Sequence, residues 1–226
     1  MSRKTLISWS SGKDSAWALH VLKQDPSVNV VGLFCTVNRM FDRVAVHGVR
    51  VELLKQQAES LNLPLHIIYI PYPCDNNDYL KAMNTFISQA KKEGVDCFAF
   101  GDLFLDDVRT YRETLLQGTG ITPLFPIWGI PTKTLSKQMI SSGLKAVITC
   151  IDPQRMALQF AGREYNESFL DDLPEDIDPC GENGEFHSFA VDGPMFQNLI
   201  EITVGETIQR DGCCFTDLLP CKSSKN

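Results

Sequence analysis

The chain has 226 residues, of which 43% are hydrophobic, and its 28 acidic and 21 basic side chains give a net charge of −7. The length suits one large α/β domain with a small appendage, and the composition is that of a globular protein with a substantial core. The acidic balance and the lack of clustered lysine and arginine argue against extended nucleic-acid binding, and no apolar run reaches the roughly 20 residues that cross a bilayer.

Apolar, β-branched segments alternate with amphipathic segments through most of the chain. Strands are predicted at residues 5–9, 28–37, 65–70, 97–101 and 146–151, with a weaker one at 124–128. Helices are predicted between them at residues 15–23, 49–61, 78–93, 108–117 and 132–142. This alternation predicts an α/β fold with a parallel sheet that is covered by helices on both faces.

The pattern changes after about residue 152. An acidic, proline-bearing stretch is followed by a polar loop over residues 178–187. Short strands are then predicted at 189–191, 199–204 and 213–218, with turns at Asp192-Gly193-Pro194 and Asp211-Gly212. We therefore predict a large domain over residues 1–152 and a smaller C-terminal α+β lobe over residues 153–226, packed near the ligand cleft.

A turn of small residues joins the first predicted strand to the first predicted helix, with the sequence Ser10-Ser11-Gly12-Lys13-Asp14-Ser15. Such a turn lets backbone N–H groups approach an anion, while the helix N-terminus and Lys13 supply positive charge. A Walker A loop requires a glycine where Ile7 stands, and a dinucleotide fingerprint requires three spaced glycines where only Gly12 is present. The turn predicts another kind of nucleotide phosphate site. The alternative is that Asp14 or Ser15 caps the helix and Lys13 is solvated.

Gly101 and Asp102 close the strand predicted at 97–101. A glycine there permits close approach of a ligand, and a carboxylate there suits Mg²⁺ binding or the orientation of a nucleophile. Ligands of parallel sheets bind at the carboxyl ends of the strands, so both residues are expected beside the phosphate turn. A helix-capping role for Asp102 explains the sequence equally well.

In the loop over residues 178–187, the two glutamates, Glu182 and Glu185, are each preceded by a glycine. This spacing suits a tight turn that presents acids to a cleft, where they would coordinate Mg²⁺ or take a proton from ammonium. Phe186 and Phe189 flank His187 and indicate that the loop is anchored to a core. A solvent-exposed acidic turn is the alternative.

Four further polar residues are candidates for the same cleft. His47 and Arg50 follow the second predicted strand. Arg109 and Glu113 are four residues apart and share a helix face, where they either pair with each other or present the guanidinium to a carboxylate or phosphate.

The eight cysteines form no C-x-x-C pair, which argues against a zinc ribbon or a redox dithiol. Several of them lie in apolar runs, where cysteine acts as a small core residue. The first four residues lead directly into a predicted strand without an apolar signal region. A reducing, cytoplasmic location is therefore expected.

The phosphate turn closely resembles the pyrophosphate loop, or PP-loop, of the adenine nucleotide alpha-hydrolase-like superfamily, with Ser11 where that loop usually has its first glycine. Over residues 5–196 the chain resembles the diphthine–ammonia ligase family (ATP-binding domain 4 type). The motifs that carry this resemblance are the phosphate turn, His47-Gly48-Val49-Arg50, Gly101-Asp102, Tyr111-Arg112-Glu113, Pro126-Ile127-Trp128 and the loop from Asp178 to His187. The resemblance implies a Rossmann-like (HUP) fold for the large domain.

The resemblance also implies a reaction. ATP binds with its pyrophosphate in the turn, a substrate carboxylate attacks the α-phosphate, and ammonia then displaces AMP to give an amide. In the family the carboxylate is that of diphthine, a modified histidine on elongation factor two. The expected cofactors are ATP and Mg²⁺, with metal ligands unassigned. Lys13, Asp102, Glu182 and Glu185 are the expected catalytic residues; ATP contacts are expected from Ser10 to Ser15 and Gly101, and substrate contacts from His47, Arg50, Arg109, Glu113 and His187.

Two other functions are weighed against the ligase. A PP-loop enzyme that modifies tRNA is disfavoured by the absence of C-x-x-C pairs and of a basic run. A regulator that binds ATP or AMP without turnover is disfavoured by the acidic loop, since a pure binder needs no such acids.

Overall fold

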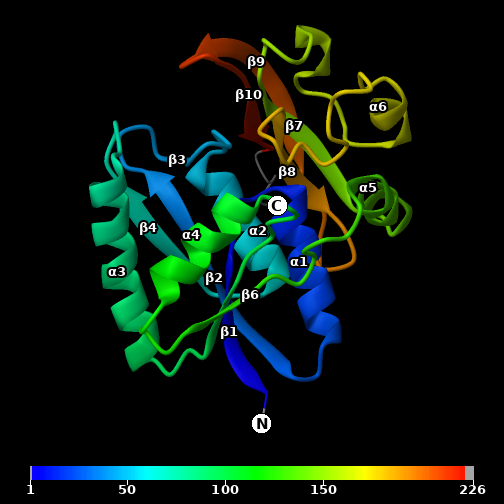
Figure 1. The fold of residues 1–226 in the computed structure, drawn as a ribbon. Helices are drawn as coiled ribbons and strands as arrows, with labels where there is room; N and C mark the ends of the chain where they lie inside the picture. The colour runs from blue at the N-terminus through cyan, green and yellow to red at the C-terminus, as the bar shows by residue number, and fades with distance from the viewer. Residues whose placement is uncertain (1, 222–226) are drawn as a thin grey trace, which may run out of the picture.

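Strand β1 (Arg3–Ser8) lies at the centre of sheet A in the computed structural model, which describes residues 2–221 (Figure 1). It pairs in parallel with β2 (Val28–Asn38) on one side and with β5 (Cys97–Ala99) on the other. The parallel strands β4 (Leu65–Ile70) and β6 (Thr122–Leu124) extend the sheet outward, and the short β3 (Arg43–Val44) pairs antiparallel with the end of β2. The strand order therefore reverses at β1, where a ligand crevice opens in Rossmann-like sheets.

Helices cover both faces of sheet A. Neighbouring residues of a strand point to opposite faces, so Leu6 and Ile7 of β1 enter two different cores. Leu6 packs with residues of α3 (Asn76–Lys92) and α4 (Asp106–Leu116), and Ile7 with residues of α1 (Lys13–Gln24) and α2 (Val51–Leu61). The parallel, doubly covered sheet predicted from the sequence is confirmed.

Sheet B is a separate antiparallel sheet with strand order β8, β7, β10, β9. Its strands are β7 (Lys145–Ile151), β8 (Phe186–Asp192), β9 (Ile202–Arg210) and β10 (Cys213–Pro220). The turn between β9 and β10 is Asp211-Gly212, with φ of 52° and 83°, as a two-residue hairpin turn requires. α5 (Thr132–Ser141) precedes this sheet, and the 3₁₀ turn Leu158–Phe160 and α6 (Glu167–Asp171) lie between β7 and β8.

The strand predicted at 146–151 was assigned to the parallel sheet, and this assignment is wrong. It is β7, which pairs antiparallel with β8 and β10 in the middle of sheet B. From Ala146 to Ile151 every residue is buried, so its continuous apolar run reads like a strand of a parallel sheet. Along the chain, β6 is the last strand of sheet A and β7 is the first strand of sheet B. The domain boundary expected at residue 152 stays a prediction.

The two sheets share one layer of helices. A single core contains Leu19 of α1, Leu54 of α2, Ile148 of β7 and Val191 of β8. α1 and α2 therefore pack against sheet A and sheet B together, which brings the loops of sheet B to the N-terminus of α1. None of the helices in residues 2–221 has the length and apolarity that crossing a membrane requires.

Candidate functional site

A cavity of about 680 Å³ opens at the carboxyl ends of β1, β2 and β5. Its wall includes Ser10, Asp14 and Ser15 from the phosphate turn and Gly101 and Asp102 from the end of β5. Sheet B contributes the opposite wall through Glu182, His187 and Ser188. Residues from both parts of the chain thus meet in one cavity, at the crevice that the strand order creates.

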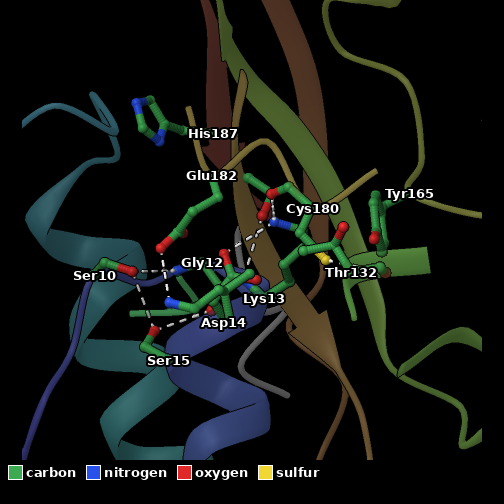
Figure 2. Close-up of polar contacts among 12 residues, drawn as sticks. Ser10, Gly12, Lys13, Asp14, Ser15, Thr132, Tyr165, Cys180, Glu182 and His187 are labelled. Atoms are coloured by element: carbon green, nitrogen blue, oxygen red, sulfur yellow. Dashed lines mark hydrogen bonds and ion pairs between the residues drawn. The ribbon is translucent and has the colours of Figure 1, made fainter. Parts of the chain in front are cut away.

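Helix α1 begins at this cavity, and its N-cap residue, Gly12, has no side chain to bond the first turn. The Gly12 N–H donates to Ser10 Oγ at 3.3 Å, the Lys13 N–H donates to Ser188 Oγ at 3.2 Å, and the hydroxyls of Ser10 and Ser15 are 3.2 Å apart (Figure 2). An uncapped N-terminus has free N–H donors and a partial positive charge, which suit an anion. The alternative in which the Asp14 or Ser15 side chain caps helix α1 is not seen.

Ser11 takes the left-handed backbone conformation that glycine adopts most easily, with φ of 70°. Its carbonyl oxygen accepts hydrogen bonds from Gln57 Nε2 and from the Ala190 N–H, both at 2.9 Å. Gln57 on α2 and Ala190 on β8 therefore hold the turn in this conformation, although serine stands at the position.

Lys13 does not line the cavity. Its side chain is 1% exposed, and Nζ donates to Asp14 Oδ2 at 2.9 Å and to the carbonyl oxygen of Cys180 (Figure 2). The rings of Tyr165 and Phe186 lie 5.4 and 5.1 Å from Nζ. Burial lowers the pKa of Lys13, but the charge and hydrogen bond of Asp14 together with the charges of Cys180 and Glu182 outweigh this, and the net pKa is raised. The ammonium thus stays charged while holding the loop before β8.

Gly101 lines the cavity, where its expected ligand contact stays a prediction, and it also has a packing role. A Cβ atom there would lie 3.0 Å from the backbone of Asp14 and Ser15. The absence of a side chain therefore lets the end of β5 approach α1 closely, rather than making room for a ligand alone. Asp102, the next residue, lines the cavity and accepts a hydrogen bond from Arg112 Nε at 3.4 Å.

The two glutamates of the 178–187 loop differ in position. Glu182 lines the cavity, and its Oε1 accepts the Leu103 N–H at 2.7 Å. Burial raises the pKa of Glu182 to about 7; the bond from Leu103 lowers it, and the carboxylates of Asp14 and Asp102 raise it. A group with this pKa exchanges protons near neutral pH.

Glu185 is fully buried and is not part of the cavity wall. Its Oε1 accepts the Asp178 N–H at 3.1 Å and Asn183 Nδ2 at 3.0 Å, and Arg155 Nη1 lies 3.3 Å away. Burial raises the pKa of Glu185, but these partners outweigh it and the net pKa is lowered. The structure therefore contradicts the expectation that both acids enter the cleft: Glu185 ties its own loop together.

His47 and His187 both line the cavity, with ring centroids 4.6 Å apart. Burial lowers the pKa of His187 to about 4, and it lowers the pKa of His47 well below the ordinary value. His47 Nδ1 is buried without a partner among the described residues. The pair is neutral near pH 7 and offers nitrogen lone pairs as well as N–H donors.

Three predicted substrate contacts lie outside the cavity wall. Arg50 binds Asp217 of β10, with Nε–Oδ1 and Nη2–Oδ2 distances of 3.1 and 2.5 Å. Arg109 and Glu113 pair at 2.9 Å on the exposed face of α4, where Arg109 stacks 4.9 Å from the ring of Trp128. These side chains find partners in β10 and in their own helix.

Sequence reasoning missed Tyr79, Tyr111 and Arg112, which line the cavity. Arg112 Nη1 donates to the Tyr79 hydroxyl at 3.3 Å, and the Tyr111 hydroxyl donates to Asn76 Oδ1 at 3.0 Å. Tyr111 and Arg112 stand in the Tyr-Arg-Glu motif, which was a usable signal, whereas no pattern around Tyr79 distinguishes it from a helix surface residue.

No group of three or more histidine, cysteine, aspartate or glutamate side chains in residues 2–221 is arranged to hold a metal ion by itself. Asp14 Oδ1 is buried and has no partner there. A cation held jointly by one or two carboxylates and a bound phosphate would fit this donor set.

Comparisons with known proteins identify the family. The diphthamide synthase N-terminal domain matches residues 3–123, and the diphthamide synthase C-terminal domain matches residues 131–217. Three curated relatives are each named diphthine–ammonia ligase: the zebrafish (Danio rerio) protein is 27% identical over 67% of this chain, the human (Homo sapiens) protein 25% over 81%, and the cattle (Bos taurus) protein 24% over 84%. The matches span 65%, 72% and 75% of these relatives' own lengths, so less than two thirds of the zebrafish protein is covered. With both domain models matched across sheet A and sheet B, the chain belongs to the diphthamide synthase family.

Proposed function

We propose that this chain is an ATP-dependent ligase that converts a carboxylate of its acceptor into an amide with ammonia, as the diphthine–ammonia ligases named among its relatives do. The observation that carries the proposal is the N-terminus of α1, which begins at Gly12 without a capping side chain of its own and opens on the cavity at the carboxyl ends of the parallel strands. Family membership supports the use of ATP there.

The turn would bind the β- and γ-phosphates of ATP through the backbone N–H groups of α1 and the hydroxyls of Ser10 and Ser15. This grip leaves the α-phosphorus facing the cavity and stabilises pyrophosphate as the leaving group. The acceptor carboxylate forms a bond to the α-phosphorus while the bond to the bridging oxygen breaks. Ammonia then attacks the acyl carbon, AMP leaves, and one proton is released.

Glu182 is the residue that we assign to the second step. Ammonium is unreactive until it loses a proton, and a carboxylate with a pKa of about 7 on the cavity wall is suited to accept it. The neutral pair of His47 and His187 lies on the same wall and would orient the ammonia by hydrogen bonds.

Mg²⁺ is the expected companion of ATP. Asp14 and Asp102 are the carboxylates that would hold the ion together with the phosphates. Asp14 Oδ1 is buried and has no partner among the described residues. The ion would neutralise charge on the leaving pyrophosphate.

The test is an ATP turnover assay with ammonium that separates AMP from ADP, with and without diphthine-bearing elongation factor two. We expect AMP and pyrophosphate only when the acceptor is present. The double variant Ser10→Ala/Ser15→Ala should weaken ATP binding about tenfold, because it removes two hydroxyl contacts. Ser141→Ala, on the exposed end of α5, is the matched control and should leave binding unchanged.

The other outcomes point to different functions. AMP formation that does not depend on the acceptor would keep adenylation and reopen the acceptor's identity. Turnover that is stimulated by tRNA would favour a tRNA-modifying enzyme. Tight ATP binding without AMP under any condition would make the chain a nucleotide-binding regulator.

A further inference from the structure

We propose that Arg112, together with Tyr79, forms a carboxylate-binding subsite in the cavity and that this subsite receives the carboxylate of the acceptor before it attacks ATP. The inference rests on the proposed function and extends it to residues to which no role has yet been given. It is carried by the hydrogen bonds that these two side chains leave unused.

Arg112 is held in place by three neighbours but keeps free donors. Nε donates to Asp102 Oδ2 at 3.4 Å, Nη1 donates to the Tyr79 hydroxyl at 3.3 Å, and the guanidinium lies 5.1 Å from the ring of Phe100. A guanidinium has five N–H donors, and both of these bonds are long. Nη2 has no partner among the described residues, and the side chain is 23% exposed at the cavity wall.

Tyr79 adds a second donor to the same place. Its hydroxyl oxygen accepts the bond from Arg112, so its own hydrogen remains free to donate. The N-terminus of the 17-residue helix α3 also meets the cavity through Asp75 and Asn76, and it adds partial positive charge. A planar guanidinium beside a phenol suits the two oxygens of one carboxylate.

The acidic groups around this place are already engaged or protonate readily. Asp102 is paired with Arg112, and Asp75 Oδ1 accepts the Asp78 N–H at 2.8 Å as the cap of α3. Glu182, with a pKa of about 7, is partly protonated at neutral pH. The free donors are therefore available to an incoming anion.

The order of contacts favours the acceptor over the phosphates of ATP. The phosphate turn touches Gly101, Gly101 leads to Asp102, and Asp102 binds Arg112. In this chain of contacts, Gly101 and Asp102 separate the turn from the guanidinium. The turn and the guanidinium therefore occupy two different places on the wall of the same cavity, one for the phosphates and one for a second anion.

Arg112→Gln and Arg112→Lys test the subsite, and Arg109→Gln is the matched control because it lies one turn earlier on α4 and outside the cavity wall. Calorimetry should give the affinities for ATP and for elongation factor two with and without diphthine. A turnover assay should give KM and kcat for the acceptor.

Arg112→Gln is expected to weaken binding of the diphthine-bearing factor at least tenfold, with a matching rise in acceptor KM, and to change the ATP affinity less than twofold. Arg112→Lys should recover only part of this loss, because lysine keeps the charge but lacks the fork. Arg109→Gln should match the wild type. Thermal unfolding of each variant separates a local loss of contact from unfolding.

A tenfold loss of ATP affinity with unchanged acceptor binding would overturn the proposal and place Arg112 in the nucleotide subsite. Unchanged values in all assays would overturn it as well. If the wild type binds the diphthine-bearing factor but forms no AMP, the proposed function fails while the binding data still decide the subsite.

Discussion

The two walls of the cavity come from different sheets, yet each divides its charged residues in the same way. On the sheet A side, Asp14 and Asp102 face the cavity while Lys13 is buried behind it. On the sheet B side, Glu182 faces the cavity while Glu185 is buried behind it. Each wall therefore combines acidic side chains that face the cavity with one buried charged side chain that holds the wall in place.

The largest effect is expected where the two walls are joined, at Lys13. Lys13→Met should lower the free energy of unfolding by about 3 kcal/mol, because it leaves Asp14 unpaired and the carbonyl oxygen of Cys180 without a donor. Chemical denaturation measures this change. Lys23→Met, on the same helix but exposed, should cost less than about 1 kcal/mol. Unchanged stability with lost ATP binding would instead place the ammonium among the phosphates.

Glu182 should affect the reaction more than the fold. With a folded pKa of about 7, its ionised form grows as the pH rises from 6 to 8, so the rate of amide formation should rise over that range. Glu182→Gln should lower this rate about a hundredfold and remove the rise, because it removes the proton acceptor. AMP formation and ATP affinity should change little. A pH profile that keeps its shape in the variant would contradict the assignment.

Glu185, in contrast to Glu182, should affect the stability of the fold more than the reaction. Glu185→Gln is expected to cost about 2 kcal/mol of stability, since a buried charged acceptor with three partners becomes neutral. The folded pKa of Glu185 lies below its ordinary value, so this stabilisation is present above the ordinary carboxyl pKa and is lost as the pH falls through the folded pKa. Acid unfolding curves of variant and wild type should therefore converge at low pH. Curves that stay parallel would exclude an ionised Glu185.

The smallest effect is expected at Ser11. Ser11→Gly should stabilise the fold by up to about 1 kcal/mol, because glycine adopts the positive φ of this turn without strain. The same change at Ser88, in the exposed interior of α3, should cost about 0.5 kcal/mol. Thermal unfolding compares the two. A destabilised Ser11→Gly variant would mean that the hydroxyl, not the backbone, matters at this position.

Most of the fold could be predicted from the sequence because its signals are local. The apolar run in β1 and the period of 3.6 along α2 predict those elements, and the Asp211-Gly212 pair predicts the hairpin of sheet B. The weaker strand expected at 124–128 was misplaced, since β6 is Thr122–Leu124 and a turn follows it. Which sheet β7 joins depends on long-range strand pairing, and the burial of its residues alone does not specify this pairing.

The site was predicted in part, for a similar reason. The phosphate turn and Asp102 could be placed from motifs that follow strand ends, and Glu182 from the acidic loop before β8. The directions in which the Lys13 and Arg112 side chains point could not be predicted, because each depends on a partner far away in the sequence. The partner is Cys180 for Lys13 and Tyr79 for Arg112. A motif identifies which residue types are present, while tertiary contacts decide which of them meet the cavity.

The phosphate turn is built from contacts between residues that are synthesised at very different times. Lys13 meets its Ser188 and Cys180 partners across 175 and 167 residues, and the Ser11 carbonyl oxygen awaits the Ala190 N–H. On the ribosome, the turn emerges well before these partners do. A nascent chain that stops before β8 therefore lacks the groups that hold the turn, and its ability to engage the nucleotide should arise only when translation of sheet B nears completion.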